Sequence, residues 1–246
     1  MSKQRYRMFQ SLLLFGLFLF LIGKVINNQL NWYINLRFIT LTQIGIVFLA
    51  ILAQRLFLEA RLPRSQAQDE EHDHDHTPAP VNLWIMLVPL LIGILIPAKP
   101  LNSSAVSAKG LTTSSPLVSS SSTSRLLETE SEQRDVLDWV KLFYFEKDLN
   151  PYIGQQASVV GFVYFDDRLP QGQFFVSRFI VSCCSADGYA VGVIVDWPNV
   201  ASLKKDTWVQ VKGPVDAVSF NNGISPLIHA EAVDIVPQPD QPYLYP

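Results

Sequence analysis

Three apolar stretches in the first 100 residues constrain this chain more than any other feature. Residues 8–26, 36–58 and 81–98 carry charged side chains only near their ends, if at all. A helix crosses the hydrocarbon core of a bilayer with about 20 apolar residues, so each stretch is long enough to span it. The third stretch is the shortest and contains Asn82 and Pro89. We predict a multi-pass membrane region over residues 1–100 with three helices, or two helices and a third segment at the membrane interface.

The basic residues around these stretches predict an orientation. Bases before a first apolar stretch can also mark a signal peptide, but polar residues rather than a small-residue cleavage site follow Ile26, which favours an uncleaved anchor. Cytoplasmic loops are enriched in Lys and Arg, so we expect the N-terminus in the cytoplasm and, after three crossings of the cytoplasmic (inner) membrane, an extracytoplasmic C-terminal domain. The residues behind this expectation are Lys3, Arg5, Arg7, Arg55, Arg61 and Arg64.

A histidine-rich loop, residues 69–76, lies between the second and third stretches. His72, His74 and His76 alternate with carboxylates in it. Imidazole and carboxylate together bind zinc, copper or nickel, but a flexible loop supplies no outer shell that orients the ligands. Two interpretations remain: a solvated, charged loop, or a weak site for a divalent metal such as zinc. In the predicted orientation this loop is cytoplasmic.

Residues 101–131 are rich in Ser and Thr, including an unbroken run of them over 119–124. Such a composition buries little apolar surface. We therefore predict a flexible linker that lets the next domain move a few tens of ångströms from the bilayer.

Residues 132–246 have the pattern of a soluble, mainly-β domain. Apolar residues recur at helical spacing over 135–144, which predicts one amphipathic helix. Short β-branched and aromatic runs separated by turn residues follow, and Gly161 and Gly213 suit bends in strands. The size favours a small OB-like barrel with one helix. The strands are expected over 157–165, 173–181, 189–196, 207–215 and 227–236.

The charge of this domain argues against nucleic acid as a ligand. From Arg134 onward there are eight basic and thirteen acidic residues, a net charge of −5. Nucleic-acid binding depends on neutralising phosphates with Lys and Arg. We expect no nucleic-acid partner.

Both cysteines of the chain, Cys183 and Cys184, are adjacent and lie between Arg178 and Asp187. Neighbouring residues of a strand point to opposite faces, so the two thiols share a side only where the backbone leaves the strand. Their Cα atoms are about 3.8 Å apart, below the usual disulfide range that begins near ~4.4 Å, which disfavours a stable bridge. Packed structural thiols, a vicinal redox pair and a pair of soft-metal ligands remain as interpretations, with Arg178 and Asp187 as candidate ligand- or partner-binding residues.

His229 is the only histidine of the predicted β domain. A lone histidine is most often a packed or surface residue. If the fold brings it to Cys183 or Cys184, the set forms a thiolate–imidazole metal site or a base-activated thiol.

Several motifs together resemble a known family. They are the apolar spans, the His-Asp loop, the segments Ile96–Pro100 and Gly161–Val163, the sequence Cys-Cys-x-Ala-Asp at 183–187, and the ending Pro-Tyr-Leu-Tyr-Pro at 242–246. In this layout the chain resembles the YcgQ-like membrane proteins over nearly its whole length. That family is described as candidate subunits of a two-component permease. The resemblance implies an accessory protein beside a polytopic membrane permease, and it implies no enzymatic activity.

Three functions are compatible with these features. The first is a non-enzymatic, membrane-anchored accessory subunit of a permease, whose extracytoplasmic domain binds or presents a solute or metal ion. The second is a thiol-redox or metal-handling protein that uses Cys183 and Cys184 directly. The third is a membrane-tethered scaffold with no ligand. The sequence contains no Gly-rich phosphate loop, His-Glu-x-x-His or Gly-x-Ser-x-Gly motif, so we expect a protein that is not an enzyme.

Overall fold

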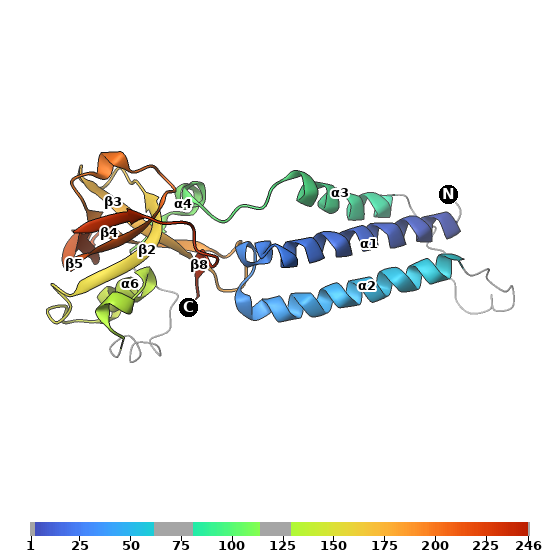
Figure 1. Cartoon of the computed structure of the whole chain (residues 1–246), viewed down its shortest axis with the longest axis horizontal. Helices are drawn as coiled ribbons and strands as arrows, with labels where there is room; N and C mark the ends of the chain where they lie inside the picture. Colours follow the sequence, from blue (N-terminus) through green and yellow to red (C-terminus); the bar gives the residue numbers. More distant parts are fainter. Residues whose placement is uncertain (1–2, 62–80, 114–128, 246) are drawn as a thin grey trace. The chain divides into compact units, whose positions relative to one another are not determined.

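A computed structural model describes residues 3–61, 81–113 and 129–245, which form two compact units, Met1–Lys99 and Pro100–Pro246 (Figure 1). The first unit contains apolar helices and the second is built mainly of β-strands. The predicted combination of a helical N-terminal region with a mainly-β C-terminal domain is confirmed. The histidine-rich loop 69–76 lies outside the described residues.

The first unit is built on an antiparallel hairpin of α1 (Lys3–Ile26) and α2 (Ile39–Arg61), connected through the short 3-10 turns η1 (Gln29–Trp32) and η2 (Leu36–Phe38). The buried residues of α2 recur every seven positions, at Ile46, Ala53 and Ala60. Two polar side chains of α1 donate to carbonyl groups of α2: Ser11 Oγ to Ala53 at 2.9 Å and Gln4 Nε2 to Ala60 at 2.8 Å. Small residues let the two backbones approach closely enough for these bonds.

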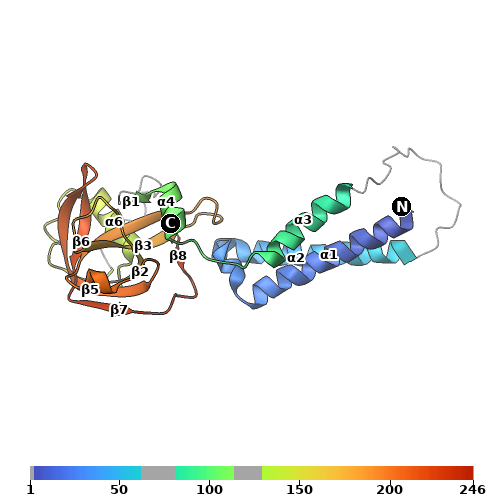
Figure 2. The same cartoon turned by 90° about the horizontal axis from the view of Figure 1, so that it is seen from above.

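The third helix, α3 (Val81–Leu95), lies beside α1 and runs in the same direction (Figure 2). Leu90 packs at Gly16, and a side chain at Gly93 would lie 2.8 Å from Phe20 Cζ. The helix stops before Pro97 because a residue that precedes proline disfavours helical backbone. Its 15 residues span about 22 Å, less than a hydrocarbon core of roughly 30 Å.

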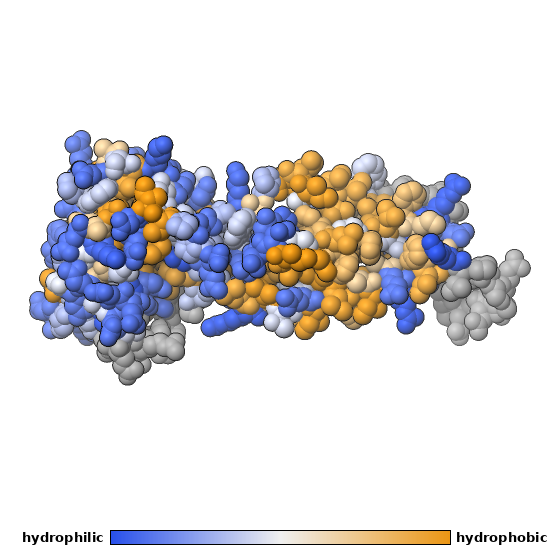
Figure 3. Space-filling model, in the orientation of Figure 1, coloured by the Kyte–Doolittle hydropathy of each residue, from blue (hydrophilic) through white to orange (hydrophobic). Residues whose placement is uncertain are grey.

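Two helical segments are long and apolar enough to cross a membrane, Gln4–Ile26 and Leu36–Arg61, and Leu83–Leu95 is a shorter apolar helix. The space-filling view shows apolar side chains over much of this unit (Figure 3). Leu12, Phe48 and Trp84 are each more than 60% exposed. Such an apolar surface needs lipid or protein to cover it.

Five strands of the second unit form a closed ring. They are β2 (Gln156–Tyr164), β3 (Gln173–Ile180), β4 (Tyr189–Asp196), β5 (Trp208–Phe220) and β6 (Gly223–His229). The ring runs β2–β3–β4–β6–β5 and returns to β2, with every pairing antiparallel except β4–β6. This is the five-stranded arrangement of an OB-like fold. A further strand, β7 (Ala232–Ile235), pairs with β5.

The interior of the ring is filled mainly by valine, and α6 (Val136–Phe145) packs into it with Trp139 and Val140 fully buried. A capping box starts this helix, because the Asp135 side chain accepts from the amide of Asp138 and the Asp138 side chain accepts from the amide of Asp135. The short 3-10 turn η4 (Ser131–Gln133) precedes α6, and a second one, η5 (Val200–Ser202), precedes β5. The helix predicted over 135–144 is therefore present.

A second apolar cluster lies on the other side of β3 and β4, with Phe175 and Phe179 of β3 alternating with interior residues. Three short elements pack there: α4 (Ser103–Lys109), β1 (Leu111–Thr112), parallel to β4, and β8 (Tyr243–Leu244), parallel to β3. OB folds commonly bind oligomeric ligands on this face. In this chain the protein's own segments cover it.

The structure differs from the predicted linker at this point. Residues 101–113 belong to the second unit, because Leu101, Val106 and Leu111 join the outer apolar cluster. The side chain of Asp206 fixes the start of α4, accepting from Ser103 N at 2.8 Å and from Ser103 Oγ at 2.7 Å. A few well-spaced apolar residues thus outweigh the Ser-rich average composition. Of the predicted linker, residues 114–128 lie outside the described residues.

Candidate functional site

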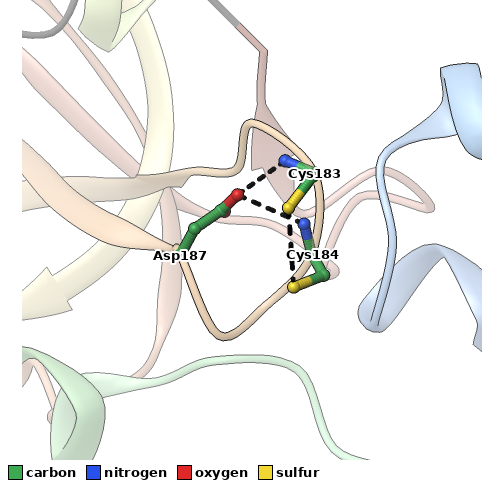
Figure 4. A group of neighbouring side chains, drawn as sticks. All are labelled: Cys183, Cys184 and Asp187. Carbon is green, nitrogen blue, oxygen red and sulfur yellow. Dashed lines mark hydrogen bonds between the residues drawn. The ribbon is translucent and has the colours of Figure 1, made fainter.

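The two cysteines lie in the connection between β3 and β4, and Asp187 organises it (Figure 4). The last strand pair is Ile180 with Tyr189. Beyond it the Asp187 carboxylate accepts three backbone N–H groups, from Ser182 at 3.1 Å, Cys183 at 2.7 Å and Cys184 at 3.4 Å. This folds the chain into a tight loop, which we call the Cys loop (residues 182–187). The backbone leaves the strand, so both thiols reach the same region.

Lys109, at the end of α4, holds the other side of the Cys loop. Its Nζ donates to the carbonyl oxygens of Ala186 at 2.9 Å, Gly188 at 2.9 Å and Ser185 at 3.4 Å. Sequence reasoning missed this residue, which is more than 70 positions away in the chain. No local motif marks it, since the contact exists only because α4 packs beside β4.

The thiols and the carboxylate of the Cys loop converge. Sγ of Cys183 is 3.7 Å from Sγ of Cys184, and the ligand atoms of Cys183, Cys184 and Asp187 all lie within 4.8 Å of one another. Cys183 is exposed, Cys184 is half-buried, and both are free thiols. Hydrogen bonding to Asp187, with a smaller effect of Cys184, raises the pKa of Cys183 to about 11. The Cys183 thiol is therefore protonated at neutral pH in the metal-free protein.

Arg178 does not join the thiols. The residue is 8% exposed, and its guanidinium donates to the carbonyl oxygens of Pro242 at 3.0 Å, Gln241 at 2.9 Å and Val160 at 3.2 Å. It also stacks over Trp208, 5.2 Å from the ring centre. Burial lowers the pKa of Arg178. Arg178 thus fixes the segment that leads into β8, and its role as a ligand- or partner-binding residue stays a prediction.

His229 lies far from the Cys loop. It pairs with Asp196 at the end of β4, whereas the Cys loop adjoins Tyr189 at the beginning of that strand. Seven residues of strand separate the two positions, about 23 Å. The imidazole is instead 3.4 Å from an Asp216 carboxylate oxygen and 3.6 Å from one of Asp196.

The metal-ligand candidates therefore fall into separate places. In the part of the chain that the structure describes, one group of three or more His, Cys, Asp or Glu side chains could hold an ion, and it consists of Cys183, Cys184 and Asp187. His229 is not a member of it. The prediction for His72, His74 and His76 concerns residues outside the described ranges.

Apolar membrane-type helices joined to an OB-like domain with a vicinal cysteine loop define a class of membrane-anchored proteins. The chain belongs to the DUF1980 family: residues 9–112 match the DUF1980 N-terminal domain and residues 121–246 match the DUF1980 C-terminal domain. The resemblance read from the sequence motifs is confirmed. Two helices of membrane-spanning length and one relative named as a membrane permease subunit indicate a membrane location.

Two curated relatives align over most of the chain. UPF0703 protein YcgQ of Bacillus subtilis (strain 168) is 25% identical over 97% of this chain and 99% of its own length. A Streptococcus mutans protein named "Putative two-component membrane permease complex subunit" is 25% identical over 94% of each chain. Among solved structures, a small single-stranded DNA-binding protein from Streptomyces coelicolor is 17% identical, with a TM-score of 0.21 over 34% of this chain and 94% of that protein. That score is too low to carry an argument.

Proposed function

We propose that this protein is a non-enzymatic accessory subunit of a membrane permease complex, anchored in the cytoplasmic membrane by several helices. Its OB-like domain lies on the extracytoplasmic side and binds or presents a metal ion or solute. The observation that carries the proposal is the near full-length alignment with a relative named as a permease complex subunit. Two helices that fit a membrane span support it.

The direction of α3 supports the predicted orientation. Because α3 runs parallel to α1, both helices end on the side opposite the basic N-terminus. Lys3, Arg5 and Arg7 favour the cytoplasm for that N-terminus. Residues 96–98, which follow α3, are also apolar and lengthen the apolar segment beyond the helix. The chain then enters the OB-like domain on the outer side.

The positions of the charged residues in the membrane helices support a separate partner protein that provides the transport pathway. Ionisable residues inside membrane spans usually mark transport routes. In α1 and α2 the charged residues, among them Lys24, Arg55 and Glu59, lie near the helix ends. The described helices thus favour a role beside a polytopic permease, and their exposed apolar faces supply surface for both lipid and that partner.

A thiol-redox function is the second candidate. Reactive cysteines have a lowered pKa that yields the nucleophilic thiolate. The carboxylate of Asp187 has the opposite effect on Cys183, which disfavours this candidate. A scaffold with no ligand is the third candidate, and the convergence of three potential ligand atoms in the Cys loop speaks against it.

Purification of the tagged full-length protein from gently solubilised membranes tests the proposal. We expect a polytopic membrane protein to copurify in stoichiometric amount and to remain bound at increasing salt. Protein that elutes alone from every mild detergent would contradict the subunit role.

Labelling of intact cells tests the orientation separately. Lys204→Cys in a chain carrying Cys183→Ser and Cys184→Ser should react with a membrane-impermeant maleimide. The matched control places a single cysteine at Ser2, which should react only after permeabilisation. The reverse pattern would overturn the assigned sides.

A further inference from the structure

We propose that the Cys loop is a three-ligand site for one thiophilic divalent cation of the zinc class, held by the Sγ atoms of Cys183 and Cys184 and by the carboxylate of Asp187. The inference deepens the proposed function and rests on it for one point, that the bound cation is cargo of the permease complex. The site itself is argued from the geometry of the loop.

The separation of the two sulfur atoms fits a shared metal ion. With Zn–S bonds of about 2.3 Å and tetrahedral angles, two thiolate ligands lie roughly 3.8 Å apart. The observed Sγ–Sγ distance is 3.7 Å. Both sulfur atoms also lie within 4.8 Å of a carboxylate oxygen of Asp187. A zinc ion holds a sulfur and an oxygen ligand roughly 3.5 Å apart, so a side-chain rotation that moves the carboxylate and a thiol about 1 Å closer together lets the three donors meet one ion.

The backbone around the donors is held in place before any ion binds. Three N–H groups bind the Asp187 carboxylate on one side, and Lys109 binds carbonyl groups on the other. Oδ1 of Asp187 accepts one of these bonds, from Ser182. A carboxylate oxygen with one hydrogen bond keeps a further lone pair for a metal. Preorganisation of this kind positions ligands and strengthens binding.

The charges of the loop also suit a divalent cation. Each thiol releases one proton to solvent when it binds the metal, so two thiolates and one carboxylate bring three negative charges to an M²⁺ ion. One negative charge remains on the complex. The ammonium group of Lys109, bound to the carbonyl groups of Ala186 and Gly188, offsets it from the other side of the loop.

The number of ligands points to an exchangeable site. Structural zinc sites are closed by four protein ligands, whereas sites that keep an open position use three. The Cys loop offers three, and Cys183 and Asp187 are exposed. Thiolate donors select zinc-class ions against Mg²⁺ and Ca²⁺, which prefer oxygen. A water molecule or a residue of the permease can occupy the fourth position, so the ion can be handed on.

Metal titration of the full-length protein in detergent tests the site. His72, His74 and His76 are first changed to Ala, which removes the histidine-rich loop as a competing metal site. We expect one Zn²⁺ per chain after desalting, and with Cd²⁺ a sulfur-to-cadmium charge-transfer band in the ultraviolet. Cys183→Ser and Cys184→Ser should each abolish the band of a two-thiolate site and lower Zn²⁺ affinity at least 100-fold. Asp187→Asn should lower it at least about tenfold, because even outer-shell partners of a metal site contribute roughly 10–100-fold to affinity.

Ser185→Ala is the matched control in the same loop and should retain one Zn²⁺. Circular dichroism checks that every variant is folded. Absence of the Cd²⁺ band in the parent protein, or full Zn²⁺ retention by both cysteine variants, would overturn the inference. Parent protein that copurifies with a permease yet binds no metal refutes the site alone. Parent protein that binds one Zn²⁺ but has no permease partner refutes the proposed function alone.

Discussion

Nζ of Lys109 lies 2.9 Å from the carbonyl oxygen of Gly188, and this contact joins α4 to the residue that follows the Cys loop. Lys109 belongs to a segment whose composition resembles a linker, yet it also binds the carbonyl group of Ala186 at 2.9 Å. A side chain at Gly188 would lie 2.7 Å from Leu101 Cδ1, so the two segments approach closely here. The first residues after the membrane region thus support the loop that carries the thiols.

Replacement of Lys109 by Met should loosen the Cys loop without unfolding the domain. The ammonium group is lost while the apolar stem remains, so the carbonyl groups of residues 185–188 lose their donor. We expect hydrogen exchange of the Asp187 and Gly188 amides to accelerate at least tenfold, as measured by mass spectrometry. Lys204→Met, a change at another exposed lysine, is the control. Equal rates of hydrogen exchange in the two variants would show that Lys109 does not hold the Cys loop in place.

Replacement of Arg178 by Met should release the C-terminal segment. Three hydrogen bonds from a buried guanidinium are lost, and hydrogen bonds that involve a charged group contribute about 1.5–3 kcal/mol. We expect the free energy of unfolding of the domain to fall by about 3 kcal/mol and residues after 240 to become sensitive to carboxypeptidase. Arg178→Lys should restore little of the lost stability, because an ammonium group cannot reproduce the planar set of donors of a guanidinium.

The exposed pair of Arg168 with Asp166 supplies the control for that measurement. Its contact is 2.6 Å, but the Arg168 side chain is 48% exposed, and exposed pairs contribute about 0.2–1 kcal/mol. Arg168→Met should therefore leave the C-terminus protected. Similar losses in both arginine variants would contradict the anchoring role of Arg178.

The elements that the sequence predicts well are those set by local pattern. Runs of apolar residues predict α1 and α2 because helix length and hydropathy alone decide whether a segment fits a bilayer. The β-branched runs predict the positions of β2, β3 and β4. By contrast, β5 was expected to end at 215 but continues to Phe220, where Asn221 and Asn222, both with positive φ, turn the chain into β6. The Asn-Asn-Gly signal marks the turn but not how far the strands extend.

The site was predictable only in part, because its contacts are not local. Cys183, Cys184 and Asp187 stand out since they are close in sequence, and the structure does bring them together. Arg178 is also near in sequence, five residues before Cys183, but its side chain leaves β3 toward the C-terminal segment. Lys109 is distant in sequence and becomes a neighbour only through the packing of α4.

Gly213 allows β5 to pass close to the end of β6, and Ala should not be tolerated there. A Cβ atom at this position would overlap the carbonyl oxygen of His229, so the backbone must shift and a closed ring transmits the strain. We expect Gly213→Ala to lower the free energy of unfolding by about 2–3 kcal/mol in chemical denaturation. Gly223→Ala is the control, because its nearest atom, the carbonyl oxygen of Phe220, is 3.8 Å away. A stable Gly213→Ala variant would show that the strands do not approach so closely.

The thiol of Cys183 should alkylate slowly at neutral pH despite its exposure. Hydrogen bonding to Asp187 raises its pKa to about 11, and only the thiolate is nucleophilic. In metal-free protein the rate of reaction with iodoacetamide at this residue should rise about tenfold per pH unit from pH 7 to 10. A neutral amide removes the negative charge, so Asp187→Asn should lower the pKa and speed the reaction at pH 7.5. Peptide mapping separates Cys183 from Cys184, and a rate that levels off below pH 8 would contradict this environment and favour the redox function.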